Sequence, residues 1–405
     1  MDVEGLRKQI PATQKLVYMN TGWSGPSPTR VVEAIERQLE HECYEGPTAR
    51  HIWEARVEVG KRARQTIARF VNGEPEEISL QANTTTGINI VVNGLSFSPG
   101  DEVISCTLEH ASGLVPLYYL RERSGVVLRI LEIEPQASAQ AILQQFEAAM
   151  NQRTKLLVLS HISYSTGIRL PLREIIRLAH QHGAQVLVDG AQSMGHIVLD
   201  MRDLEADFYA FPGHKWLLGP DGVGGLFIRR DLIESVRPVD VGHWATKEYD
   251  FQGHFTPETE SIMKFEMSTT NGALWAGMTE AMDMQEEIGK AAIEERTIEL
   301  TSLARRRLSE IPKVRVVGPL EGETTCGLVC FAIEGIAAPQ VSSLLWERAG
   351  IVCRSVRETA STRLSLHYFN TEKEVEQVAV AVRELARDGA GAVDPALADG
   401  FPRDV

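Results

Sequence analysis

Seven short apolar segments alternate with segments of helical apolar spacing between residues 77 and 229. This alternation predicts βαβ units around a largely parallel sheet. Two of the segments, 156–159 and 186–188, are continuously apolar, as expected of strands that are covered on both faces. The predicted strands are 77–81, 102–106, 126–131, 155–160, 185–188, 208–211 and 225–229.

The pattern changes after about residue 267. A long helical region, 273–311, is followed by short strands and helices, which is typical of a smaller α+β domain. We therefore expect a large domain over 16–267 and a small domain made of 1–15 and 268–387. The final stretch, 388–405, is rich in Gly, Ala, Pro and Asp and is expected to fray.

Composition narrows the classes of function. A formal net charge of −14 disfavours nucleic acid and anionic membranes as partners, because neither would be attracted electrostatically. No apolar run approaches the length of a membrane span, and the charged N-terminus lacks the apolar core of a signal peptide. The five cysteines are scattered and include no CxxC pair, so we expect a cytoplasmic protein without a metal site.

One lysine, Lys215, lies on a glycine-rich connection between the apolar segments 208–211 and 225–228. Lysine is rarely placed where buried strands meet unless its amine has a role there. Desolvation lowers the pKa of such an amine and leaves it free to attack carbonyls. On this segment alone two interpretations remain open: a Schiff-base lysine for pyridoxal phosphate, or a solvated lysine on a surface turn.

A polar motif, Asp189-Gly-Ala-Gln192, directly follows one buried strand. In open α/β sheets, ligands lie beyond the carboxyl ends of the strands. A buried carboxylate needs a cationic partner, and the pyridinium nitrogen of pyridoxal phosphate is one. Gln192 is then placed to bond the phenolic oxygen of the cofactor. The alternatives for Asp189 are a salt bridge or a Mg²⁺ ligand, but the latter requires a GxxxxGK[ST] loop that the chain lacks.

The phosphate of such a cofactor needs backbone amides at a helix N-terminus, with hydroxyl groups nearby. Thr85 and Thr86 follow the first predicted strand and provide them, and His214 can add a further donor. His110, which follows the strand 102–106, can stack on the pyridine ring and move protons, although a turn histidine is the simpler interpretation. Taken in order, these residues agree with one cofactor site.

Four motifs together resemble the class V aminotransferase family of fold type I enzymes. The resemblance extends over residues 16–385. That family includes cysteine desulfurases, cystine and cysteine C–S lyases, isopenicillin N epimerase-like enzymes and kynureninase. The motifs are Thr84-Thr-Thr-Gly-Ile-Asn89, Leu108-Glu-His-Ala111, Val188-Asp-Gly-Ala-Gln192 and Gly213-His-Lys215.

The resemblance implies an α/β, fold type I enzyme with pyridoxal 5'-phosphate bound to Lys215. The segment Phe265-Glu-Met-Ser-Thr-Thr-Asn271 resembles the part of the family that completes the phosphate site of a neighbouring subunit, which suggests Thr269 and a homodimer. One family position is changed, because Pro212 replaces the usual Ser or Thr. The implied cofactor residues are Lys215, Asp189 at the pyridine nitrogen, Gln192 at the phenolic oxygen, His110 on the ring, and Thr85, Thr86 and His214 at the phosphate.

The resemblance also indicates a substrate site. Arg363 matches the arginine that binds the α-carboxylate of the substrate, a role that suits a planar guanidinium. Tyr164 and Trp244 are candidates for shaping the substrate pocket. Desulfurases of this family carry a persulfide-forming cysteine on a longer loop before this arginine, but the stretch 355–362 has none. Cys353 lies in a predicted strand, 350–354, and is interpreted as a small buried residue.

These features favour a C–S lyase, which expels a sulfur leaving group and forms pyruvate and ammonia. A desulfurase that lacks the usual loop cysteine remains an alternative. A second alternative is an aminotransferase, epimerase or cyclase for a specialised amino acid. A degenerate, non-enzymatic scaffold or sensor is disfavoured because Lys215, Asp189, Gln192 and His110 are costly to bury without a cofactor.

Overall fold

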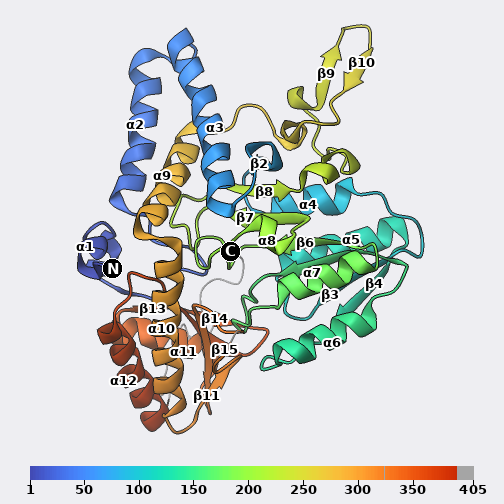
Figure 1. Ribbon diagram of the computed structural model, residues 1–405. Helices are drawn as coiled ribbons and strands as arrows, with labels where there is room; N and C mark the ends of the chain where they lie inside the picture. The colour runs from blue at the N-terminus through green and yellow to red at the C-terminus, as the bar shows by residue number, and fades with distance from the viewer. Residues whose placement is uncertain (323, 390–405) are drawn as a thin grey trace.

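The computed structural model describes residues 1–322 and 324–389 (Figure 1). All seven expected strands form, and they join one sheet in the order β2-β8-β7-β6-β5-β3-β4. Their bounds are β2 Ile78–Gln81, β3 Glu102–Cys106, β4 Val127–Leu131, β5 Thr154–Ser160, β6 Gln185–Asp189, β7 Phe208–Pro212 and β8 Gly224–Ile228. Most of the tail for which fraying is expected, 390–405, lies outside the described residues.

The large sheet is mostly parallel, as predicted. Strands β3 to β7 pair in parallel, whereas β8 runs antiparallel to both of its neighbours, β2 and β7. Because the strands of a parallel sheet point the same way, their carboxyl ends meet at one edge. This edge positions the polar residues that follow β3, β6 and β7.

Helices cover both faces of this sheet, which explains its continuous apolar strands. On one face α4 and α5 pack against Val158 and Leu187, and on the other α6 and α7 pack against Leu157 and Val188. None of the described helices is long and apolar enough to cross a bilayer. The helices of this part are α2 Thr29–Glu45, α3 Arg50–Val71, α4 Thr84–Gly94, α5 Ala111–Ser124, α6 Ala139–Ala149, α7 Leu172–Gln181 and α8 Met201–Leu204.

A second, antiparallel sheet in the order β11-β12-β15-β14 lies below the first in Figure 1, with its own apolar core. The short strand β1 (Val17–Tyr18) pairs with β13 (Ile351–Val352) beside it. The domain boundary near residue 267 stays a prediction. The other elements here are α1 Val3–Lys8, β11 Val314–Val317, β12 Leu328–Ile333, α11 Ala338–Ala349, β14 Arg354–Val356, β15 Ser361–Ser365 and α12 Glu372–Asp388.

Two features differ from the expected pattern. The long helix expected over 273–311 is two helices, α9 (Gly272–Ile288) and α10 (Lys290–Ser309). They are separated at Gly289, whose φ of +95° is outside the range of a right-handed helix. An unexpected hairpin of β9 (Thr246–Tyr249) and β10 (Phe255–Pro257) projects from the body of the molecule (Figure 1).

Candidate active site

The three expected catalytic residues lie at the carboxyl edge of the parallel strands. Asp189 is the last residue of β6, Lys215 follows the end of β7, and His110 caps the helix after β3. The approach of α4 to the sheet depends on a small residue, since a Cβ at Gly87 would lie 2.9 Å from the Cβ of Ala210 in β7. The end of α4 that carries the threonines is thereby held against the strand that leads to the lysine.

Asp189 and Lys215 form the charged centre of this site. The Asp189 side chain is buried and accepts a hydrogen bond from the Ala191 N–H at 2.8 Å. Burial raises the pKa of this carboxyl group, and the nearby Lys215 amine opposes the change. Burial lowers the pKa of Lys215 to about 8, although Asp189 acts in the opposite direction. The amine is therefore available as a nucleophile near neutral pH.

His110 has a defined tautomer. Its Nδ1 accepts the Ser112 N–H at 3.1 Å, so the proton of the neutral ring is on Nε2. The pKa of the imidazole is lowered by desolvation and by the positive charge of Lys215, which keeps the ring neutral. The ring of Tyr164 contacts it edge-on, with 4.9 Å between the two centroids. A neutral ring with a partly exposed face fits stacking on a planar cofactor.

The expected phosphate residues lie at the N-terminus of α4 and beside Lys215. Asn83 caps α4, and its Oδ1 accepts both the backbone N–H and the hydroxyl of Thr86. The exposed Thr85 is the next residue toward the start of the helix. The half-buried His214 has its Nδ1 3.6 Å from the carboxylate of Asp221. Pro212 ends β7 as a buried residue, so it adds no hydroxyl group.

Arg363 has the geometry of a carboxylate receptor. It lies on β15 with a side chain that is 0% exposed. One nitrogen, Nη1, donates to the backbone oxygen of Tyr164 at 3.0 Å, whereas Nε and Nη2 have no partner among the described residues. Burial lowers the pKa of the guanidinium to about 10. A buried cation with two unsatisfied donors is costly, and a bidentate carboxylate would satisfy them.

A second arginine, Arg354, was not recognised as a site residue in the sequence. It is directly opposite Arg363 in the β14–β15 pair, so both side chains extend to one face of the sheet. The Arg354 guanidinium lies 4.7 Å from the centroid of the Trp23 ring. Its charge lowers the pKa of both Lys215 and Arg363. The pairing of these two short strands could have identified it.

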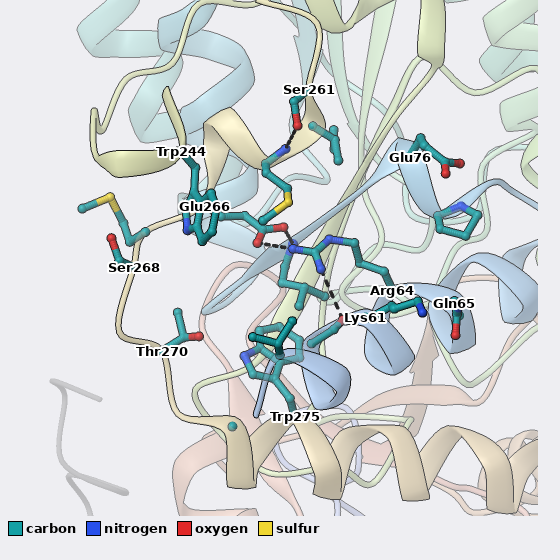
Figure 2. A pocket seen from close by; sticks show the side chains of 18 of the residues that line it. Lys61, Arg64, Gln65, Glu76, Trp244, Ser261, Glu266, Ser268, Thr270 and Trp275 are labelled. Carbon is teal, nitrogen blue, oxygen red and sulfur yellow. Dashed lines mark hydrogen bonds and ion pairs between the residues drawn. The ribbon is translucent and has the colours of Figure 1, made fainter. Parts of the chain in front are cut away.

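Trp244 and Thr269 lie elsewhere in the chain. They line a cavity of 860 Å³ between α3 and the segment 260–275, and its lining includes none of Lys215, Asp189 or His110. Figure 2 shows Trp244 in this cavity together with Glu266 and Thr270. The expectation that Trp244 shapes the substrate pocket stays a prediction.

Comparisons with known proteins identify the family. The family model described as Aminotransferase class-V matches residues 17–378. The chain belongs to the class V aminotransferase family. A probable cysteine desulfurase of Methanothermobacter thermautotrophicus is 32% identical over 96% of this chain and 99% of that protein. A cysteine desulfurase of Salmonella choleraesuis is 30% identical over 95% and 98%.

Solved structures of class V enzymes have the same fold. The cystine C–S lyase C-DES, solved with its reaction product cysteine persulfide, has a TM-score of 0.87 and is 29% identical over 93% of this chain and 99% of that chain. An apo cysteine desulfurase of Thermococcus onnurineus has a TM-score of 0.86 and 27% identity, covering 95% and 98%. The fold is that of the fold type I pyridoxal phosphate enzymes, as the sequence motifs predicted.

This class V protein is a pyridoxal phosphate-dependent enzyme, and its residues fit that cofactor. A variant of C-DES has been solved with glycine covalently linked to its pyridoxal phosphate. Here a desolvated amine, a buried carboxylate and a helix N-terminus lie at one edge of the sheet, as an aldehyde, a pyridinium and a phosphate require. The assignment of each residue to its cofactor atom stays a prediction.

Thiols are absent from the turn that precedes Arg363. The connection between β14 and β15 is the turn 357–360, which contains no cysteine. Cys353 is only 3% exposed, and burial raises the pKa of its thiol to about 12. The interpretation of Cys353 as a small buried residue is confirmed. Among the described cysteines only Cys43, on α2, is exposed.

The lowered pKa of Lys215 predicts the pH dependence of cofactor uptake. Only the neutral amine attacks the aldehyde, so the rate at which cofactor-free protein takes up pyridoxal phosphate should rise with pH around a midpoint near 8. An ordinary lysine would have its midpoint near 10.5. Stopped-flow absorbance from pH 6 to 10 measures this rate.

Two variants provide the controls for this prediction. Lys215→Ala should remove the visible band, whereas Lys373→Ala, at an exposed position on α12, should change neither the band nor the midpoint. A band that persists unchanged in Lys215→Ala, or a wild-type midpoint above 10, would contradict the assignment.

Proposed function

We propose that this enzyme is a C–S lyase that acts on cystine or a cysteine-like substrate and forms pyruvate, ammonia and a sulfide or persulfide. The observation that carries the proposal is the short β14–β15 turn, which contains no thiol to accept sulfur. Cys330 is opposite Arg363 on β12, but its thiol is fully buried and burial raises its pKa to about 12. The similarity to C-DES over almost the whole chain supports the same activity. The names of the desulfurase relatives favour the competing reaction, in which an enzyme thiol takes the sulfur.

The proposed roles of the residues follow from their chemistry. Arg363 holds the α-carboxylate of the substrate, and Lys215 removes the proton from Cα. Bound pyridoxal phosphate, with its ring nitrogen kept protonated by Asp189, would supply a sink for the electrons released at Cα. The Cβ–S bond would then break with its electron pair on sulfur. The Nε2–H of the neutral His110 ring would hydrogen-bond the departing sulfur, and the ammonium formed on Lys215 would return to it the proton taken from Cα. The resulting 2-aminoacrylate hydrolyses to pyruvate and ammonia without a further protein group.

The reaction products decide between lyase and desulfurase. Incubation of the holoenzyme with cystine or cysteine should yield pyruvate and ammonia in equal amounts, measured with lactate dehydrogenase and an ammonia assay. A desulfurase would instead yield alanine and leave a persulfide on the protein. We expect turnover to survive Cys353→Ala and Cys43→Ala, because neither thiol takes part.

Other products would overturn the proposal in specific ways. Alanine as the main product, abolished by either cysteine substitution, would establish a desulfurase. If neither sulfur substrate reacts, while another amino acid is transaminated, epimerised or cyclised, the alternative class of reaction would replace the lyase.

The role of Arg363 predicts a separation of substrate binding from cofactor binding. In Arg363→Ala the substrate loses a charge-assisted bidentate pair worth about 2 kcal/mol, so KM should rise roughly 30-fold. The visible spectrum of the cofactor should stay unchanged. Arg363→Lys keeps the charge without the planar fork and should be intermediate.

Arg307→Ala, on α10, is the matched control and should leave KM unaltered. Loss of the cofactor in Arg363→Ala, with a normal fold by circular dichroism, would refute the assigned role.

We further propose that the active unit is a homodimer in which Thr269 completes the phosphate site of the partner subunit. The 860 Å³ cavity around Thr269 and Trp244 supports this arrangement (Figure 2), because large apolar side chains among its mixed lining are exposed to solvent in one chain. Trp53 is 60% exposed, Met267 51% and Trp244 41%. Large apolar side chains gathered at one surface indicate a protein interface.

Complementation between two inactive variants tests this arrangement. Lys215→Ala and Thr269→Ala homodimers should each have low activity, at the pyridoxal phosphate concentration where the wild type is saturated. Co-expressed chains should regain about a quarter of wild-type activity, because half of random dimers are mixed and each mixed dimer has one intact site. No recovery, or a monomer in sedimentation velocity, would contradict the shared site.

A further inference from the structure

The residue after the cofactor lysine, Trp216, is fixed by contacts of its indole ring, its indole N–H and its backbone oxygen. Its side chain is 0% exposed. The indole ring stacks on His196 with 3.9 Å between centroids and 15° between planes. Its backbone oxygen accepts hydrogen bonds from Gln285 Nε2 at 2.6 Å and His367 Nε2 at 2.8 Å. The indole Nε1–H donates to Gln192 Oε1 at 2.9 Å. Neither the proposed reaction nor the cofactor site so far uses this residue.

These contacts determine how the side-chain amide of Gln192 is oriented. An amide can be flipped without changing its shape, so its neighbours decide which end is oxygen. The indole nitrogen of Trp216 can only donate, so Oε1 must face it. Nε2 then donates one N–H to the backbone oxygen of Gly22 at 2.8 Å. Its second N–H has no acceptor within residues 1–322 and 324–389, and is free for a ligand.

A flipped amide would lose both of these bonds. It would set the Nε2 donors of Gln192 against the Trp216 N–H, and Oε1 against the Gly22 carbonyl oxygen. The space is also restricted, because a Cβ at Gly22 would lie 2.8 Å from Gln192 Oε1. The observed orientation is therefore the only one that satisfies all three groups.

The backbone of Gln192 is held from the opposite side by His196. The N–H of Gly327 donates to His196 Nε2 at 2.7 Å, so the proton of this neutral ring is on Nδ1. Nδ1–H donates to the backbone oxygen of Gln192 at 2.7 Å. Burial lowers the pKa of His196 to about 3, which keeps the ring neutral and the pattern unchanged at physiological pH. Gly327 directly precedes β12, the neighbour of the strand that carries Arg363.

We propose that Trp216 is a positioning residue that orients Gln192, so that the second Nε2–H of the amide is donated to the phenolic oxygen of the cofactor. The proposal rests on the cofactor site described above. The negative charge on the phenolic oxygen stabilises the protonated nitrogen of the bond between Lys215 and the cofactor. A hydrogen bond from Gln192 to that oxygen weakens this stabilisation. That nitrogen therefore loses its proton at a lower pH when the side-chain amide of Gln192 is correctly oriented.

The test is a spectroscopic pH titration of the holoenzyme. Trp216→Phe keeps an aromatic ring against His196 and removes only the N–H. The midpoint of the visible absorbance change should move upward by about one pH unit, a roughly tenfold change in proton affinity. Gln192→Ala should shift it by a similar amount, and the double variant should shift it no further than Gln192→Ala alone. A tryptophan that only supports packing would show no such coupling.

Two further variants complete the design. Trp346→Phe alters a tryptophan on α11 that is 50% exposed and has no bond to Gln192, and should leave the midpoint unchanged. Gly22→Ala leaves Trp216 intact and displaces the same amide from its other side, so it should also raise the midpoint. It keeps the proposal testable if Trp216→Phe does not fold.

Each remaining outcome has a definite meaning. An unchanged midpoint in Trp216→Phe, with a raised midpoint in Gln192→Ala, would overturn the role of Trp216. Independent, additive shifts in the double variant would do the same. A wild-type protein that shows no visible band with pyridoxal phosphate would instead contradict the cofactor site itself.

Discussion

The electrostatic interaction between the Asp189 carboxylate and the Lys215 amine is the one on which the site depends. Desolvation disfavours the charged form of both groups, and each charge partly offsets that cost for the other, because Lys215 lowers the pKa of Asp189 and Asp189 raises the pKa of Lys215. They are close because β6 and β7 are adjacent parallel strands, with Asp189 paired to Ala210. The continuous apolar strands below them supply the low-dielectric surroundings that lower the pKa of the amine.

Positive charge is concentrated around this pair. Arg354 and Arg363 both lower the pKa of Lys215, and Arg363 keeps two buried donors unsatisfied. The carboxylate of Glu358 partly offsets this charge, and it raises the pKa of both Arg354 and Tyr164. A chain with a formal charge of −14 therefore has a cationic site, which suits a ligand that carries a phosphate and a substrate that carries a carboxylate.

The predictable part of the fold was the part with a strong local pattern. The seven strands of the large sheet occur within one or two residues of their expected positions, because buried parallel strands are continuously apolar. The break at Gly289 was missed, since a single glycine between two helical patterns has no other local mark. The β9–β10 hairpin was missed because its strands are short and largely exposed, and so lack a buried face.

The sequence by itself determined the chemistry of the site: a lysine, an aspartate, a glutamine and a histidine at the ends of apolar strands, and no cysteine before Arg363. Local patterns carry this information because a charged residue next to a buried strand is rare without a role. Only the tertiary structure decided that Arg354 stands beside Arg363, that Trp216 orients Gln192, and that Trp244 and Thr269 line a separate cavity. These relations join residues that are not neighbours in the chain, and strand pairing and side-chain packing create them.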